Sequence, residues 1–348
     1  MVIALLLEIE WYLVLSIHFS LTKIWGFVHF FVTLTIVEGS LVGCADFCRD
    51  SDIQTSLMPL AAPSVREKQN KIWFSAHLFV PLAAMNSLIN VRGRLIDLSQ
   101  PMVMGILNVT PDSFYEGSRT MTEEAIAARA RQIVGEGAGI IDVGACSTRP
   151  GGETVAEADE LQRLELALNV VRSEVPEAIV SVDTFRPEVA RRCVDEWGAD
   201  IVNDVAPSTE MFDMVARLGV PYVLTSRAAT LAEMLKELSG MVNALHSRGQ
   251  KDIIIDPGFG FGKSTEENFA VLAHMEHLQW LELPVLVGVS RKSMIYKTLG
   301  VGPDEALTGT TAIHTIALQK GASILRVHDV REAVETIKIV KEVRELRS

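Results

Sequence analysis

The stretch MVMGILNVTPDSF (residues 102–114) passes abruptly from an apolar run into a polar segment. Its first six residues are apolar or glycine, which is typical of a strand buried on both faces. Asn108, Thr110, Asp112 and Ser113 then end the run. Residues of these types form turns and helix caps, so the stretch alone indicates a buried strand followed by a polar turn.

Apolar runs of this kind recur along the chain. The others are GIIDVG (139–144), AIVSVD (178–183), DIVND (200–204), PYVLT (221–225), DIIID (252–256), PVLVGV (284–289) and SILRV (323–327). Longer stretches separate them, such as TEEAIAARARQIVGEG (122–137), with apolar residues three and four positions apart. Eight alternations predict parallel strands with crossover helices. We therefore predict a (β/α)₈ TIM barrel, with a doubly wound open sheet as the alternative.

The region before the first run divides into two parts. Apolar residues alternate around Arg92–Gly93, which predicts an N-terminal β-hairpin leading into the barrel. Residues 85–348 are close to the roughly 250 residues of one barrel domain. Residues 1–84 are predicted to be a hydrophobic extension of doubtful structure, either disordered or the product of a misplaced start codon. A membrane anchor is the alternative, although Lys23 leaves no uncharged run near the roughly 20 residues of a membrane helix.

Charge and cysteine content limit the partners of the chain. The net charge is −12 and no basic run could follow a phosphate backbone, so we expect no nucleic-acid partner. The four cysteines have neither the spacing of a zinc site nor the density of a disulfide scaffold. A cytoplasmic location fits this pattern best.

Polar residues follow seven of the eight predicted strands. In a barrel the carboxyl ends of the strands meet on the face where active sites lie. The sequence therefore predicts one pocket containing carboxylates, amides and cations. Arg326 and His328 follow the last strand, where barrels often hold phosphate, and arginine forms paired hydrogen bonds to phosphate oxygens. The predicted pocket residues are Asn108, Arg149, Asp183, Asn203, Asp256, Lys292, Arg326 and His328.

Three other motifs do not indicate separate sites. DPGFGFGKS (256–264) lacks the first glycine of a nucleotide-binding loop, so its glycines are expected to allow close backbone approach. His274 and His277 are expected on a solvated outer face and not at a metal. Cys146 is expected to be a packing residue, because no histidine is placed to activate it.

Several motifs together resemble the dihydropteroate synthase family, in the order in which that family carries them. They are GILNVTPDSF (105–114), GIIDVGACSTRPGG (139–152), SVDTFRPEVA (181–190), IVNDV (201–205), DPGFGFGKS (256–264), VLVGVSRKSM (285–294) and ILRVHDV (324–330). The resemblance covers roughly residues 86–348. It implies a TIM-barrel transferase of folate biosynthesis, which condenses 6-hydroxymethyl-7,8-dihydropterin diphosphate with 4-aminobenzoate and releases pyrophosphate. It also implies a Mg²⁺-dependent homodimer.

The resemblance assigns a role to each site residue. Asn108 would help to hold Mg²⁺ on the diphosphate. Asp183, Asn203, Asp256 and Lys292 would bind the pterin, and Arg149, Arg326 and His328 would meet the diphosphate. Thr148, Pro150 and Ser293 would lie close to the 4-aminobenzoate. Residues 108–119 and 145–153 would be mobile loops. The implied catalytic residues are Asp183, Lys292, Arg326 and His328.

The chain departs from the family pattern at two places. Thr225, Ser226 and Arg227 replace a Met-His-Met type run in the wall of the pterin pocket. Ala145–Cys146 replaces a Gly-Glu pair. Two alternative functions are a noncatalytic pterin-binding paralogue, suggested by the first departure, and the pterin-binding barrel of a methyltransferase. The methyltransferase would not need STRPGG (147–152) or SRKS (290–293), and both are present.

Overall fold

The computed structural model describes residues 87–110, 122–146 and 155–346, together with the backbone of four strands nearer the N-terminus. The chain forms two units, residues 1–72 and 73–348. The strands β1 (Val2–Leu5), β2 (Leu13–Lys23), β3 (Gly26–Val37) and β4 (Ser40–Cys44) make an antiparallel sheet in the first unit. The predicted boundary between residues 84 and 85 lies outside the described residues and stays a prediction. Among the residues that are described, no helix is both long and apolar enough to cross a membrane.

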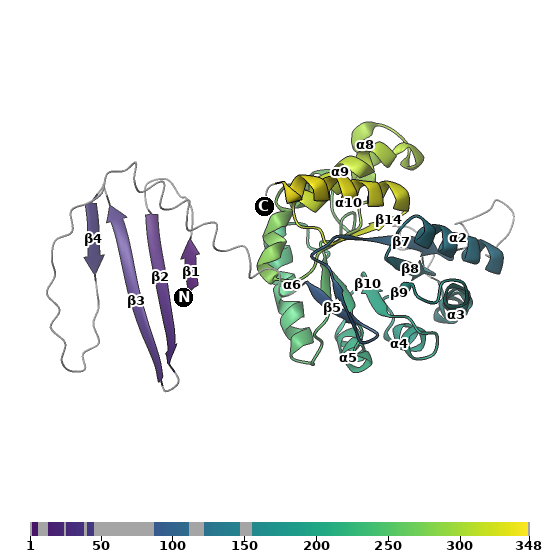
Figure 1. Cartoon of the computed structure of the whole chain (residues 1–348), viewed down its shortest axis with the longest axis horizontal. Helices are drawn as coiled ribbons and strands as arrows, with labels where there is room; N and C mark the ends of the chain where they lie inside the picture. Colours follow the sequence, from purple (N-terminus) through teal and green to yellow (C-terminus); the bar gives the residue numbers. More distant parts are fainter. Residues whose placement is uncertain are drawn as a thin grey trace. The chain divides into compact units, whose positions relative to one another are not determined.

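Parallel strands form a barrel in the second unit, as predicted (Figure 1). Strand β14 pairs with β7, and a bridge between Ile255 and Val285 joins β12 to β13, which closes the ring and excludes the open sheet. Within the described residues the eight strands are β7 (Met102–Asn108), β8 (Ile140–Gly144), β9 (Ile179–Asp183), β10 (Ile201–Asp204), β11 (Tyr222–Thr225), β12 (Ile253–Asp256), β13 (Leu286–Val287) and β14 (Ile324–Val327).

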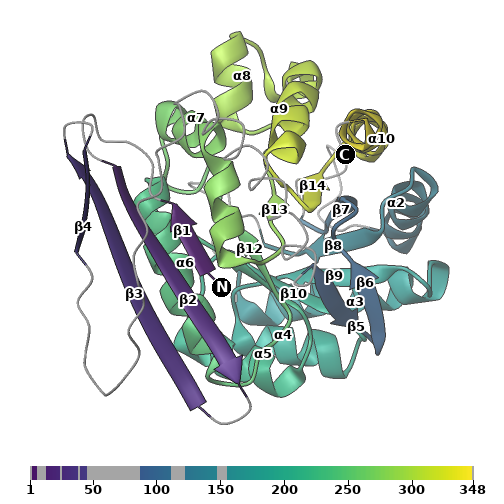
Figure 2. The same cartoon turned by 60° about the vertical axis from the view of Figure 1, so that its left-hand side comes forward.

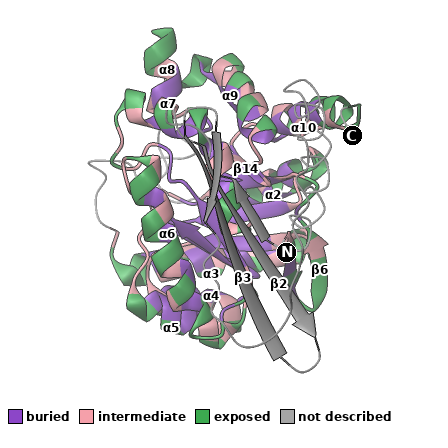
Figure 3. Ribbon diagram, turned by 90° about the vertical axis from the view of Figure 1, so that its left-hand side faces the viewer, coloured by how far each residue is buried: buried purple, intermediate pink, exposed green. Residues whose placement is uncertain are grey.

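Helices surround the strands and bury one face each against them (Figure 3). Polar side chains cap several of them. Thr122 and Ser264 accept hydrogen bonds from the first turns of α2 and α7, and Glu267 completes a capping box with Ser264. The described helices are α2 (Glu123–Gly135), α3 (Glu157–Glu174), α4 (Pro187–Asp195), α5 (Thr209–Leu218), α6 (Leu231–His246), α7 (Thr265–Ala273), η2 (Met275–Leu281), α8 (Ser293–Leu299), η3 (Pro303–Glu305), α9 (Leu307–Gln319) and α10 (Val330–Glu345).

The predicted hairpin, whose two strands lie side by side in Figure 2, packs against the amino-terminal end of the barrel. Its strands β5 (Leu88–Val91) and β6 (Arg94–Asp97) meet at a turn in which Arg92 and Gly93 both have positive φ. Arg92 forms an ion pair with the buried carboxylate of Asp200. Ile89 and Val91 pack with the inward-facing apolar residues of the strands, namely Met104, Ile140, Ile201, Val223, Ile254, Leu286 and Ile324. Within the residues that the structure describes, the hairpin and this apolar layer thus seal the amino-terminal end of the lumen.

Candidate active site

The inward-facing residues change from apolar to polar along the barrel axis. Side chains alternate between the two faces of a strand, so the residue two positions after an inward-facing one also faces the lumen. On six strands, the residue two positions after the sealed apolar layer is polar, when Ile179, which packs against that layer, is included. These residues are Asp142, Ser181, Asn203, Thr225, Asp256 and Arg326. The barrel thus has an apolar base beneath a charged, hydrogen-bonding layer.

A row of paired residues continues the site toward the rim. Asn108, Gly144, Asp183 and Asn203 are partners across β7, β8, β9 and β10. A methyl group placed on Gly144 would lie 3.4 Å from Asn108 Oδ1 and 3.4 Å from Asp183 Cβ. Gly144 is therefore bordered by the amide of Asn108 on one neighbouring strand and by Asp183 on the other.

Arg326 lies at the centre of the polar layer. Its Nε donates to Asp142 Oδ2 at 2.6 Å, and its Nη2 donates to Asp183 Oδ2 at 2.6 Å. Burial opposes the arginine charge, but these two carboxylates outweigh it and raise the pKa of Arg326. Burial also raises the pKa of Asp183 to about 7, with Arg326 opposing the shift and Asp142 adding to it. This balance leaves a carboxylate that changes charge readily near neutral pH.

Lys292 and Asp256 carry opposite charges in the pocket, and each shifts the pKa of the other. The ammonium of Lys292 donates to the carbonyl of Phe259 and lies 4.6 Å from the ring centre of Phe261. Burial lowers the pKa of Lys292 to about 8, and Asp256 opposes that shift. Burial raises the pKa of Asp256, whose Oδ1 accepts from the backbone N–H of Gly258 at 2.8 Å. Both groups are held in place before a ligand arrives.

His328 is fixed beside the arginine by the loop that follows β13. Its Nδ1 lies 3.1 Å from Ser290 Oγ, and its backbone N–H donates to the same hydroxyl at 3.2 Å. Burial, followed by the charge of Arg326, lowers the pKa of His328 to about 4. The imidazole is therefore neutral at pH 7. It can act on an anion as a hydrogen-bond donor but not as a cation.

The structure brings together most of the predicted site residues. Six of them lie on or directly after strands of one barrel face, and Lys292 lies in the loop after β13, where it precedes α8. The six are Asn108, Asp183, Asn203, Asp256, Arg326 and His328. Ser293 begins α8 directly after Lys292 and is half-buried. Thr148, Arg149 and Pro150 lie outside the described residues, as does most of both predicted mobile loops, so their assignments stay predictions.

Two other polar residues at strand ends make hydrogen bonds or ion pairs that stabilise the barrel itself. Asp204 accepts from the hydroxyl of Tyr222 at 2.7 Å and from the backbone of Ala206 at 2.7 Å. Asp329 pairs with Arg291 at 2.7 Å, which ties the loop after β13 to the end of β14. Hydrogen bonds and ion pairs within the scaffold thus explain part of the pattern of polar strand ends.

Sequence reasoning missed Asp142, which is fully buried in the polar layer. It lies inside the run GIIDVG, two residues before the strand ends, whereas the predicted site was drawn from residues at strand ends. The available signal was a carboxylate within a buried strand, because such a charge needs a partner.

The two departures from the family pattern have different surroundings. Thr225 is buried in the polar layer, and among the described residues its hydroxyl has no hydrogen-bond partner. Ser226 donates to Glu237, and Arg227 is exposed. Cys146 lies 3.7 Å from the Arg186 guanidinium. Burial and then Glu160 raise the pKa of Cys146 to about 11, which agrees with its interpretation as an unreactive residue.

Two features outside the polar layer contribute nothing to it. His274 is exposed, as predicted, and His277 stacks on it at 6.0 Å between ring centres. Within the part of the chain that is described, no group of three potential ligands among His, Cys, Asp and Glu could hold a metal.

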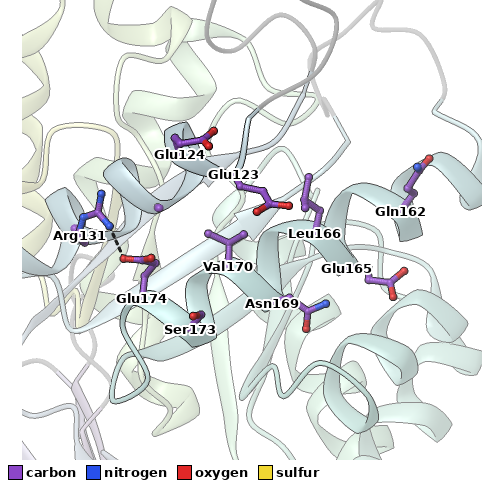
Figure 4. A pocket seen from close by; sticks show the side chains of 11 residues that line it. Glu123, Glu124, Arg131, Gln162, Glu165, Leu166, Asn169, Val170, Ser173 and Glu174 are labelled. Atoms are coloured by element: carbon purple, nitrogen blue, oxygen red, sulfur yellow. Dashed lines mark hydrogen bonds and ion pairs between the residues drawn. The ribbon is translucent and has the colours of Figure 1, made fainter.

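A cleft of about 780 Å³ lies between α2 and α3 and contains the ion pair of Arg131 and Glu174 (Figure 4). It lies on the flank of the barrel, away from the carboxyl ends of the strands.

Comparison with known proteins identifies relatives across the whole barrel. A family model described as pterin binding enzyme matches residues 104–328. Dihydropteroate synthase from Escherichia coli (strain K12) is 39% identical over 267 residues, which span 72% of this chain and 94% of that protein. The Bacillus subtilis (strain 168) enzyme of the same name is 37% identical over 250 residues, spanning 69% and 87%.

Solved structures give the same result. A structure of Xanthomonas albilineans dihydropteroate synthase with 4-aminobenzoic acid has a TM-score of 0.71 at 38% identity, covering 75% of this chain and 99% of that one. A structure of the enzyme in complex with 7,8-dihydropteroate has a TM-score of 0.67 at 38% identity, with coverage of 74% and 98%. The similarity therefore extends over nearly the full length of these relatives.

Proposed function

The chain belongs to the dihydropteroate synthase family of pterin-binding enzymes, and we propose how its residues divide the work of that reaction. It is a transferase of folate biosynthesis that acts on a pterin and 4-aminobenzoate. The amine nitrogen bonds to the methylene carbon of 6-hydroxymethyl-7,8-dihydropterin diphosphate. The carbon–oxygen bond to the diphosphate breaks, pyrophosphate leaves, and the amine loses one proton to solvent.

The observation that carries this assignment is that Arg326 pairs with the carboxylates of Asp142 and Asp183 on the strand that His328 directly follows. A leaving diphosphate gains negative charge, which Arg326 and the neutral His328 can stabilise by donating hydrogen bonds. The methylene carbon gains positive charge as the bond breaks, and the carboxylate of Asp183 can stabilise that charge. The aromatic amine is nucleophilic without activation, so the site needs no serine or cysteine.

We assign the pterin to the part of the pocket where the polar layer meets the row of paired residues below the rim. Its amino-pyrimidine edge carries several N–H donors, which suit the acceptors of Asp183, Asn203 and Asp256. Lys292 supplies a cation beside Asp256 and completes this subsite. Ser293 would face the 4-aminobenzoate, together with Thr148 and Pro150 of the second loop, and Arg149 would meet the diphosphate.

Magnesium is proposed as the cofactor, held jointly by the substrate and Asn108. Mg²⁺ prefers oxygen ligands and is commonly bound through substrate phosphates with only one or two protein groups. The amide oxygen of Asn108 lies beside Gly144 at the carboxyl end of β7, so a hard oxygen donor is available at the rim. When bound, the ion would neutralise charge on the diphosphate.

A homodimer is proposed through α9 and α10, which pack against each other. Ile339, Val343 and Leu346 recur four and three positions apart on one face of the α10 segment, and all are exposed, with Leu346 90% accessible. Ile316 is exposed on α9. An apolar face of this kind supports pairing with a second copy about a two-fold axis. The predicted cytoplasmic location stays a prediction.

Pyrophosphate release tests the proposed activity. The purified protein should release pyrophosphate only when Mg²⁺, the pterin diphosphate and 4-aminobenzoate are all present. A sulfonamide should compete with 4-aminobenzoate, because one relative has been solved with such a drug. Tight binding of the pterin without any release of pyrophosphate would instead identify a noncatalytic pterin-binding protein.

A further inference from the structure

Asp142 contacts two of the site residues from within the barrel. Its side chain is fully buried. The same oxygen, Oδ2, accepts from Arg326 Nε at 2.6 Å and from Asn203 Nδ2 at 3.1 Å. The other oxygen, Oδ1, is buried and has no hydrogen-bond partner in the part of the chain that the structure describes. A buried acceptor without a partner costs stability, so maximum stability does not account for this arrangement.

We infer that Asp142 is a positioning residue, which fixes the side chains of Asn203 and Arg326 in the orientations that the pterin diphosphate requires. The inference rests on the proposed function, because that function identifies the ligand. Asp142 itself is covered by its neighbours and would act through the two residues that it holds.

The first effect concerns the direction of hydrogen bonding at Asn203. An ionised carboxylate can only accept hydrogen bonds, so Asn203 must turn its NH₂ group toward Asp142. The carbonyl oxygen of Asn203 then faces another direction. Asp183 and Asp256 are also acceptors when ionised. Asp142 thereby keeps this part of the pocket complementary to a ring edge that is rich in N–H donors.

The second effect concerns the guanidinium of Arg326. An arginine carries five N–H donors, and the contacts with Asp142 and Asp183 occupy two of them. Asp142 holds the Nε end of this guanidinium inside the lumen. The remaining donors can then turn toward an anion at the rim without release of the side chain. A fixed arginine loses less conformational entropy when it binds the diphosphate.

The test is Asp142→Asn in the full-length protein, with Ser181→Ala as the matched control. Asparagine has nearly the same shape, but it can donate as well as accept, so Asn203 is free to turn its NH₂ group toward the ligand. Ser181 pairs with Asp142 in the barrel register, and its buried hydroxyl also lacks a partner among the described residues. Among the described residues, the Ser181 side chain makes no hydrogen bond to Arg326 or Asn203.

Steady-state kinetics of pyrophosphate release give the readout. For Asp142→Asn we expect the KM for the pterin diphosphate to rise about 10- to 100-fold, the loss expected for a charged hydrogen bond. The Michaelis constant for the aminobenzoate should stay within about twofold, as should both constants in Ser181→Ala. Equal rises for both substrates, or no rise for the pterin diphosphate, would overturn the inference.

The double variant Asp142→Asn with Asn203→Asp provides a second test of the positioning role. The amide and the carboxylate exchange places, so the ligand again meets an acceptor at position 203. The KM for the pterin diphosphate should fall below that of Asp142→Asn alone. If Asp142→Asn does not fold, this swapped pair decides alone. A KM within about tenfold of wild type then supports the positioning role, and a larger rise overturns it.

Failure of the proposed function would give a different result. A wild-type protein that releases no pyrophosphate refutes the activity. In that case equilibrium binding of the pterin diphosphate to wild type, Asp142→Asn and Ser181→Ala replaces the kinetic comparison. The same 10- to 100-fold difference in Kd is then expected for Asp142→Asn only.

Discussion

Burial shifts the pKa values of the charged residues in the pocket, and Lys292 shows this most clearly. Outside a protein its ammonium would stay protonated far above neutral pH, but in the barrel its pKa is about 8. The charge of Asp256 opposes this lowering of the pKa, and the Phe259 carbonyl and the Phe261 ring contact the ammonium. The pocket can therefore lose a needed charge after a modest rise in pH.

We predict that kcat/KM for the pterin diphosphate falls as the pH rises through about 8, because Lys292 then becomes neutral. Once the required cation is lost, the fall should approach about tenfold per pH unit. The measurement is pyrophosphate release at low substrate concentration between pH 6 and pH 10, with wild type and Lys292→Arg in parallel.

Lys292→Arg is the informative comparison, because arginine stays protonated throughout this range. The variant should be less active overall, since a planar guanidinium does not reproduce the compact contacts of the ammonium. Its remaining activity should not decline above pH 8. A decline of the same size in both proteins would assign the titration to a different group.

Among the elements, the loop after β12 depends on glycine for two separate reasons. Gly258 and Gly262 both have positive φ, at 64° and 65°. A Cβ atom on Gly258 would lie only 2.0 Å from the carbonyl oxygen of Ser226, whereas nothing lies within 4 Å of one on Gly262. The predicted close backbone approach in DPGFGFGKS is confirmed at Gly258. It brings the loops that follow β11 and β12 into contact next to Asp256.

We predict that Gly258→Ala destabilises the protein far more than Gly262→Ala. Both substitutions incur the left-handed backbone penalty of about 1–2 kcal/mol, but only the first forces two loop backbones apart. The expected loss for Gly258→Ala is more than about 3 kcal/mol, measured by urea unfolding. The hydrogen bond from the Gly258 N–H to Asp256 should weaken too, so activity should fall even under conditions in which the variant is still folded. Equal losses in both variants would mean that the loops separate at little cost.

In the molecule as a whole, the exposed face of α10 is the dimer interface proposed above. In a two-fold dimer a substitution is present on both sides of the interface, so a single charge there acts twice. We predict that Val343→Asp raises the Kd of the dimer at least about tenfold, measured by analytical ultracentrifugation. The control is Leu95→Asp on the hairpin, where the leucine is 69% exposed. Dissociation by both variants, or by neither, would place the interface elsewhere.

The sequence by itself determined the barrel, the hairpin and most of the polar residues of the site. Alternating strands and helices leave few ways to bury both faces of a parallel sheet, and every strand then ends on one face. That is why Asp183, Asn203, Asp256 and Arg326 could be grouped from the order of residues alone.

Only the tertiary structure decided which partner each charge takes. Asp142 became visible as the anchor of Arg326 and Asn203, whereas Asp204 and Asp329 proved to be scaffold residues. The physical reason is that local sequence fixes the direction of a side chain on its strand, but ion pairs across a barrel join residues far apart in the chain. Such contacts, for example that between Asp142 and Arg326, exist only once the ring has closed.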